Sequence, residues 1–175
     1  MSRFLKEHVV NTVNYDLLNK FVYKDVSKLP VLSNIDLQFR FKTYSSESLF
    51  ISLSALEIIG SNKCYVLKTK TSNVSLKLRK GSPIGCKVVL RKNDALNFIV
   101  LLINTLPIET KQNSSSVNKS GYLLERFISN PLVLPGLAGN YHFFRKLGGL
   151  NVKFITTSKT DKELNYLLRS YKLRA

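Results

Sequence analysis

The clearest strand signal in this chain is the stretch Ile35-Asp36-Leu37-Gln38-Phe39-Arg40-Phe41-Lys42. Apolar and polar residues alternate strictly along it, which is typical of a strand with one buried face. We therefore expect Phe39 and Phe41 to lie in the core with Ile35 and Leu37. The opposite face of the sheet would then be free for a partner.

Three helices are predicted around this strand. Apolar residues recur at helical spacing from Phe4 to Phe21, which predicts an amphipathic N-terminal helix. The stretch from Ser46 to Ile59 is rich in Leu, Ile and Ala and is followed by Gly60, which favours a second helix with a glycine stop. Residues Ala95 to Leu106 are apolar on nearly all sides, so we expect a third, buried helix.

Short strands are expected between the second and third helices. Cys64 to Thr69 and Val74 to Arg79 have strand-like patterns and flank a small polar tip. Gly81 to Gly85 is a turn cluster, and Cys86 to Arg91 predicts a further strand. In the middle strand, the side chains expected to face the core are Val74, Leu76 and Leu78.

The last third of the chain mixes weak and strong signals. The Ser, Asn and Lys content near 109–121 predicts a mobile loop, and Tyr122 to Ile128 is strand-like. Residues Pro131 to Asn140 form an excursion that could be ordered or mobile. Residues 150–155 then alternate as a strand does, and Thr160-Asp161-Lys162-Glu163 is a capping box that begins a terminal helix.

These elements predict a single α+β domain over residues 1–175. We expect a mainly antiparallel sheet, with helices packed on one face and a projecting basic β-hairpin. Within it, residues 1–28 would form an N-terminal helix and linker, and residues 29–175 the α+β core. We find no internal repeat and no domain boundary.

The charge of the chain implies a polyanionic partner. Its 175 residues include 27 Lys plus Arg against 11 Asp plus Glu, which gives a net charge of +16. Nucleic acid and an anionic membrane surface are the main choices. The longest apolar run, Phe98 to Ile103, is far shorter than the roughly 20 residues of a membrane-spanning helix, so we expect no membrane insertion.

Basic residues gather in one block without a compensating carboxylate. No Asp or Glu occurs between Ile58 and Asn93. Because the block lies on expected strands and a hairpin, it favours binding to nucleic-acid phosphates. We assign phosphate binding to its basic members, which are Lys63, Lys68, Lys70, Lys77, Arg79, Lys80, Lys87, Arg91 and Lys92.

Catalytic patterns are weak by comparison. The two histidines, His8 and His142, are isolated from any metal-ligand spacing, and Cys64 and Cys86 form no CxxC pair. Gly81 to Lys87 departs from a phosphate-binding loop in its spacing and lacks the Ser or Thr that would hold magnesium. We therefore predict no enzyme activity, no metal and no cofactor.

Three motifs resemble one known family. The segment Arg79-Lys80-Gly81-Ser82-Pro83-Ile84-Gly85-Cys86-Lys87-Val88-Val89-Leu90-Arg91 looks like the signature of the universal large-subunit ribosomal protein five family. Gly149 to Ser158, with the capping box at Thr160 to Glu163, resembles that family's closing strand and helix. Further matches fall in the same order at Leu29-Pro30-Val31, Gly60 and Leu134-Pro135-Gly136-Leu137, so the resemblance covers nearly the whole chain.

This resemblance implies a non-catalytic protein of the central protuberance of the large ribosomal subunit. In the family, the protein binds large-subunit rRNA and usually 5S rRNA, and it meets a small-subunit head protein in an intersubunit bridge beside neighbouring large-subunit proteins. A hairpin tip touches the P-site tRNA. By position, that tip here is Thr71, Ser72, Asn73, Val74 and Ser75.

The resemblance also implies positions for a 5S rRNA contact. The family commonly reads Leu-Asn-Met-Gly-Val-Gly in the first strand and Gly-Gln after the second helix. This chain has Gln38 and Arg40 in that strand and Ser61 after that helix, so these are the candidate 5S rRNA contacts.

Composition and the N-terminus favour an organellar source. Lys, Asn, Ile, Phe and Tyr are abundant, as expected from an AT-rich genome, and the first residues lack the features of a transit peptide. We therefore expect a mitochondrial, organelle-encoded protein of the matrix ribosome, with a plastid or a bacterial cytoplasm as the alternatives. Two other functions stay open: a free RNA-binding regulator or chaperone using the same basic face, and an enzyme acting on RNA.

Overall fold

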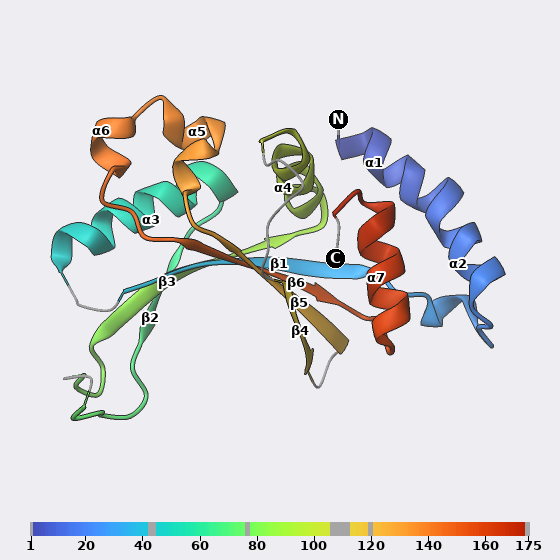
Figure 1. Cartoon of the computed structure of the whole chain (residues 1–175), viewed down its shortest axis with the longest axis horizontal. Helices are drawn as coiled ribbons and strands as arrows, with labels where there is room; N and C mark the ends of the chain where they lie inside the picture. The colour runs from blue at the N-terminus through green and yellow to red at the C-terminus, as the bar shows by residue number, and fades with distance from the viewer. Residues whose placement is uncertain (1, 42–44, 76–77, 106–112, 119–120, 174–175) are drawn as a thin grey trace. The chain divides into compact units, whose positions relative to one another are not determined.

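The computed structural model describes residues 2–41, 45–75, 78–105, 113–118 and 121–173 (Figure 1). The described chain combines helices with a sheet that contains antiparallel strand pairs, as expected of an α+β protein. The predicted fold class is therefore confirmed. Its helical elements are α1 Ser2–His8, the π-helical turn Val9–Val13, α2 Asn14–Lys20, the 3-10 turn Val26–Lys28, α3 Ser46–Gly60, α4 Lys92–Thr105, the 3-10 turn Pro131–Val133, α5 Pro135–Ala138, α6 Tyr141–Phe144 and α7 Asp161–Ser170.

The strands form one sheet in the order β2-β3-β1-β6-β5-β4. The pairs β2 with β3 and β4 with β5 are antiparallel. No helix in the described part of the chain is long and apolar enough to span a membrane. The strands are β1 Leu32–Arg40, β2 Tyr65–Lys68, β3 Pro83–Arg91, β4 Asn113–Asn118, β5 Gly121–Ile128 and β6 Leu150–Thr156.

The chain divides into two compact units, which we describe separately. The first unit contains Met1–Ile35, Arg91–Arg126 and Lys153–Ala175, and the second contains Asp36–Leu90 and Phe127–Val152. Strands β1 and β6 therefore each contribute residues to both units.

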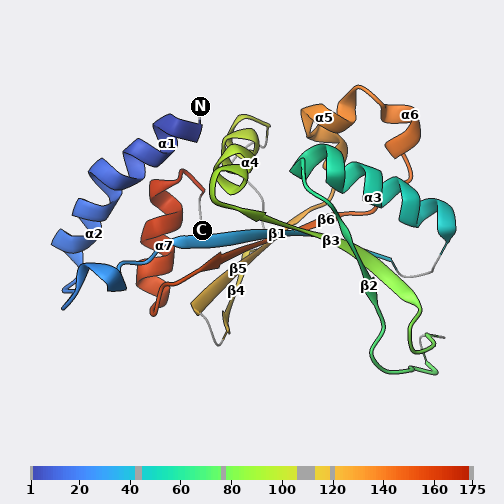
Figure 2. The same cartoon turned by 180° about the vertical axis from the view of Figure 1, so that it is seen from behind.

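The first unit joins the two ends of the chain. Helix α2 lies beside α7 (Figure 2), where the ring of Phe21 meets that of Tyr166 edge-on at 6.1 Å and the Lys20 ammonium lies 4.3 Å above the Tyr166 ring. Helix α7 begins with the predicted capping box, since the Thr160 hydroxyl accepts from the Glu163 N–H and the Glu163 carboxylate accepts from the Thr160 N–H. The sequence-based expectations for both helices are confirmed.

The second unit packs α3 against α5 and α6 (Figure 1). The excursion at residues 131–140 is ordered here, because Leu134 and Leu137 are buried. Ser45 caps α3 by accepting from the Ser48 N–H, and Ser61 ends the helix in the left-handed conformation, with φ of 52°. Helices α5 and α6 therefore cover one side of α3, and Ser45 and Ser61 define its two ends.

The structure corrects two expectations about the sheet. Residues 113–118 form β4, paired residue by residue with β5, although their composition predicted a loop. The rest of the expected loop lies outside the described residues or in β5. On β1, Phe39 is buried as expected, whereas Phe41, which follows the strand, is only half-buried. Asp36 and Gln38 on the opposite face are only 4% and 8% exposed. That face is therefore not free along β1.

Strand β3 approaches β1 closely at Gly85. A Cβ atom at this position would lie 2.3 Å from the Phe39 carbonyl oxygen, closer than any side chain tolerates. The Phe41 N–H donates to the Ile84 carbonyl at 2.9 Å, and the register of β3 against β2 shifts at the same place, between Leu67 and Lys68. The glycine thus permits an irregular but hydrogen-bonded contact between the two strands.

We predict that Gly85→Ala destabilises the protein by about 2–3 kcal/mol, because the added methyl group must push β3 away from the β1 backbone. Gly139→Ala is the matched control, since a Cβ atom there meets nothing within 4 Å and its φ is −63°. Urea denaturation followed by circular dichroism measures both variants. Equal unfolding midpoints for the two would contradict the role of Gly85.

Candidate nucleic-acid interface

The connection between β2 and β3 is held together by backbone and hydroxyl hydrogen bonds. The Thr69 N–H donates to the Ser82 carbonyl at 2.9 Å, and the Gly81 N–H donates to the Thr69 carbonyl at 3.0 Å. The Ser82 hydroxyl donates to the Arg79 carbonyl at 2.7 Å. Gly81 has a φ of 86°, which favours glycine in this turn. These hydrogen bonds therefore fix the backbone at the base of the loop, next to Arg79 and Lys80.

The tip of this loop is a closed turn. Asn73 and Leu78 exchange two backbone hydrogen bonds of 2.9 Å, and the Asn73 side chain accepts from the Ser75 N–H at 3.1 Å. All five predicted tip residues, Thr71 to Ser75, are exposed.

The expected strand Val74 to Arg79 is wrong in its described part. Val74 and Ser75 lie in a turn, Leu78 forms an isolated bridge with Asn73, and Arg79 belongs to no strand. Val74 is 92% exposed and does not face the core. The physical reason is that the Asn73 side chain begins a local turn, which overrides the alternating pattern. Leu76 and Lys77 lie outside the described residues.

Most of the predicted phosphate-binding residues are exposed. Among the described residues, none of the exposed members forms an ion pair. In the second unit these are Lys63, Lys68, Lys70, Arg79 and Lys80. Arg91 and Lys92, which are also exposed, belong to the first unit.

Lys87 differs from the rest of the basic set. Its ammonium lies 2.6 Å from the Asp36 carboxylate, and the Asp36 side chain is only 6% exposed. Removing either partner would leave a charge in a poorly solvated place, so the pair holds β3 against β1. Its place in the acid-free block predicted Lys87 as a phosphate contact, but the sequence could not reveal the carboxylate on the neighbouring strand.

The three candidate 5S rRNA contacts are all in the second unit but differ in exposure. Arg40 and Ser61 are exposed, whereas Gln38 is buried. The Arg40 guanidinium donates to the Gln38 side-chain oxygen at 3.4 Å. Gln38 therefore orients Arg40 and offers little surface of its own.

The cysteines of the second unit are unsuited to catalysis. Burial is the largest cause that raises the pKa of Cys64 to about 12, with Glu57 and Cys86 adding to it. Burial also raises the pKa of Cys86, whose sulfur lies 3.3 Å from the Ser52 hydroxyl. Both thiols stay protonated near neutral pH and are weak nucleophiles. No cluster of potential metal ligands occurs among the described residues.

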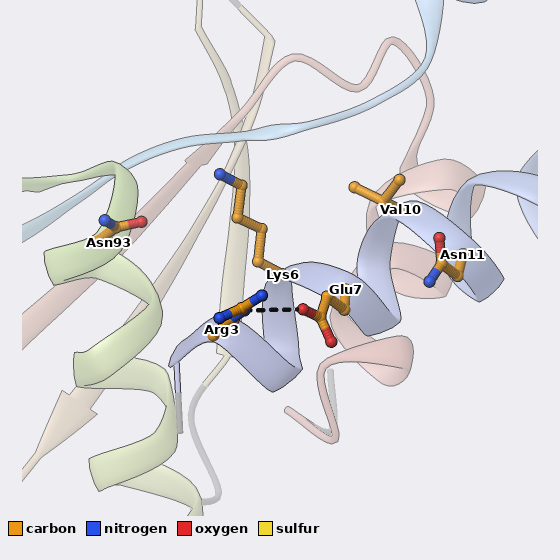
Figure 3. Close-up of a pocket in the computed structure, with 6 residues that line it drawn as sticks. All are labelled: Arg3, Lys6, Glu7, Val10, Asn11 and Asn93. Atoms are coloured by element: carbon orange, nitrogen blue, oxygen red, sulfur yellow. Dashed lines mark hydrogen bonds and ion pairs between the residues drawn. The ribbon is translucent and has the colours of Figure 1, made fainter.

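A cavity of about 480 Å³ lies in the first unit between α1 and the start of α4 (Figure 3). Arg3 donates to the Glu7 carboxylate at 3.1 Å, which neutralises the carboxylate drawn there. Lys6 has no ion pair within the described part of the chain. Among the described lining residues, Lys6 is therefore the charged group that is left without an ion pair.

A second stretch without carboxylates was not predicted. No Asp or Glu occurs in residues 126–160, which include Arg145, Lys146 and the two exposed aromatic residues of α6, Tyr141 and Phe143. The signal was present in the composition, but only the structure shows that α6 packs beside α3.

Comparison with known proteins supports a ribosomal role. Residues 83–174 match the ribosomal L5P family C-terminus. This region begins with the β3 segment that contains Gly85 and Lys87 and ends after α7.

Full-length relatives match nearly the whole chain. Large ribosomal subunit protein uL5m of Reclinomonas americana is 31% identical, over 97% of this chain and 96% of the relative. Large ribosomal subunit protein uL5 of Nitrosomonas europaea is 32% identical, over 98% of this chain and 97% of the relative. The expected family and the expectation of a non-enzymatic protein are confirmed by these matches: the chain belongs to the uL5 family of structural proteins of the large ribosomal subunit.

Proposed function

We propose that this protein binds large-subunit rRNA through the exposed basic residues of the β2–β3 region. One observation carries the proposal: residues 58–93 contain no carboxylate, and their exposed Lys and Arg side chains have no ion pair among the described residues. Unpaired surface cations are free to replace the counterions of RNA phosphates. The residues assigned to this contact are Lys63, Lys68, Lys70, Arg79, Lys80, Arg91 and Lys92, with Lys77 from the sequence alone.

The more specific RNA and protein partners are proposed from the family resemblance. The exposed tip at Thr71 to Ser75 contacts P-site tRNA, and its small polar side chains suit close approach to a nucleic-acid backbone. Arg40 and Ser61 contact 5S rRNA, with Gln38 holding Arg40 in place. The protein also meets a small-subunit head protein and neighbouring large-subunit proteins.

The proposed location is the mitochondrial ribosome. The similarity to uL5m of Reclinomonas americana supports it, as does a composition typical of an AT-rich genome. Bacterial relatives match equally well, so location needs its own measurement.

We predict that Arg79→Ala weakens binding to rRNA and lowers the slope of log K against log salt by about 0.9, the value for one lost duplex phosphate contact. The matched control is Lys28→Ala, because Lys28 is paired with Asp25 at 2.5 Å. Filter binding at several salt concentrations gives the slopes. An unchanged slope for Arg79→Ala would remove this residue from the interface.

Unlike Arg79→Ala, Lys87→Met is expected to change the stability of the protein and not its binding to RNA. It should lower the free energy of unfolding by about 1–3 kcal/mol, because Asp36 loses its charged partner, and leave the salt slope unaltered. Lys68→Met makes the same chemical change at an exposed lysine. The Lys68→Met variant should keep the free energy of unfolding of the unaltered chain and show a smaller slope of log K against log salt. If Lys87→Met lowers the slope while the protein stays equally stable, Lys87 contacts RNA and the ion pair is secondary.

Sedimentation tests ribosomal assembly and location together. Organelle lysate is separated on a sucrose gradient, with and without magnesium depletion, and the chain is followed by mass spectrometry. We expect co-migration with the large subunit of a mitochondrial preparation under both conditions. Recovery only at the top of the gradient would instead support a free RNA-binding regulator.

A further inference from the structure

Exposed aromatic side chains gather on the helical side of the second unit. Phe143 of α6 is 74% exposed, Phe50 of α3 is 67% exposed, and Tyr141 is 50% exposed. Phe and Tyr rings of this size are normally buried in part by their own fold. Three in one neighbourhood therefore indicate a surface that is covered by a partner.

Phe50 and Phe143 line the same cavity. Its volume is about 390 Å³, within the range of about 300–1,000 Å³ for sites that hold small ligands. Phe144 is buried, Ile51 is half-buried, and both also line it. The cavity thus presents two exposed aromatic rings above an apolar base.

Polar groups stand in the same lining. Ser54 contributes a hydroxyl and Asn140 an amide, and both residues are exposed. The Asn140 side chain makes no hydrogen bond within the described part of the chain. A ligand that enters between the rings can therefore meet both a donor and an acceptor at its edge.

The surroundings of the cavity are cationic. Arg145 follows α6, is exposed and has no ion pair within the described ranges. The nearby carboxylate of Glu47 is already paired with Lys146 at 3.6 Å. Residues 126–160 contain no acid, so no carboxylate of that segment offsets Arg145. The carboxylate of Glu57 on α3 accepts from the Cys64 N–H at 3.4 Å. An anionic partner is therefore favoured over a neutral apolar helix.

We propose that this cavity receives an unpaired RNA base, stacked on Phe143 and Phe50, with Arg145 contacting the adjoining phosphate. Flat aromatic surface, amide and hydroxyl groups at the edge, and an unpaired guanidinium are the combination that single-stranded nucleic acid requires. The inference rests on the proposed RNA-binding function and adds to it a second site, which recognises a base rather than the phosphate backbone alone.

Phe143→Leu tests the stacking in the full chain, because leucine keeps an apolar side chain but has no aromatic ring. The probes are a single-stranded oligoadenylate of about twelve nucleotides and an abasic oligomer of the same length. We expect Phe143→Leu to weaken binding of the oligoadenylate by about 5- to 140-fold, the range for loss of one base–aromatic stack. Binding of the abasic oligomer should not change.

Two further variants identify the source of the effect. Phe4→Leu alters a phenylalanine that is 76% exposed on α1 of the first unit, and it should leave both affinities unaltered. Arg145→Ala should lower the salt slope by about 0.7, the value for one single-strand phosphate, whereas Phe143→Leu should not alter the slope.

Phe143→Trp gives a direct signal, because the chain contains no other tryptophan. Quenching of its fluorescence by oligoadenylate, and not by the abasic oligomer, would support the stack. Equal affinity of Phe143→Leu and the unaltered chain for oligoadenylate would overturn the inference and favour a protein partner at this surface. If the unaltered chain bound neither oligomer at any salt concentration, the proposed function would fail as well.

Discussion

The close approach of β3 to β1 at Gly85 is the constraint on which the second unit depends. With hydrogen as its side chain, Gly85 lets the Phe39 carbonyl lie where a Cβ atom would otherwise be. The next two residues, Cys86 and Lys87, make different contacts. Cys86 is buried beside Ser52 of α3, and Lys87 reaches Asp36 on β1. Three successive residues thus join a helix and two strands.

This arrangement explains why the centre of the most recognisable motif has a structural role, while the cations at its two ends are available to a partner. Gly85, Cys86 and Lys87 belong to the segment that resembles the family signature, and each has a role inside the fold. The cations left for a partner lie before and after them. A lysine in a basic block is therefore not automatically available to RNA: its availability depends on whether the sheet places a carboxylate beside it.

The sequence predicted those features that depend on local pattern. β1, β6 and the capping box of α7 were correct, because alternation and the Thr160–Glu163 pair act within a few residues. It failed where pairing is non-local. Strand β4 is held by its register with β5 despite a loop-like composition. For the interface, the sequence identified the basic set but could not separate Lys87 from it.

The exposed aromatic surface of α3 and α6 could not be predicted from the sequence, because its residues are distant along the chain. Phe39 and Phe41 were expected in the core and therefore not available to stack on RNA bases, and Phe39 is buried. The two exposed phenylalanines that line this cavity come from two helices separated by about half of the chain. Neither Phe50 nor Phe143 is notable within its own segment. Their common cavity exists because α5 and α6 pack on α3, so a tertiary contact, and not a motif, creates the candidate base site.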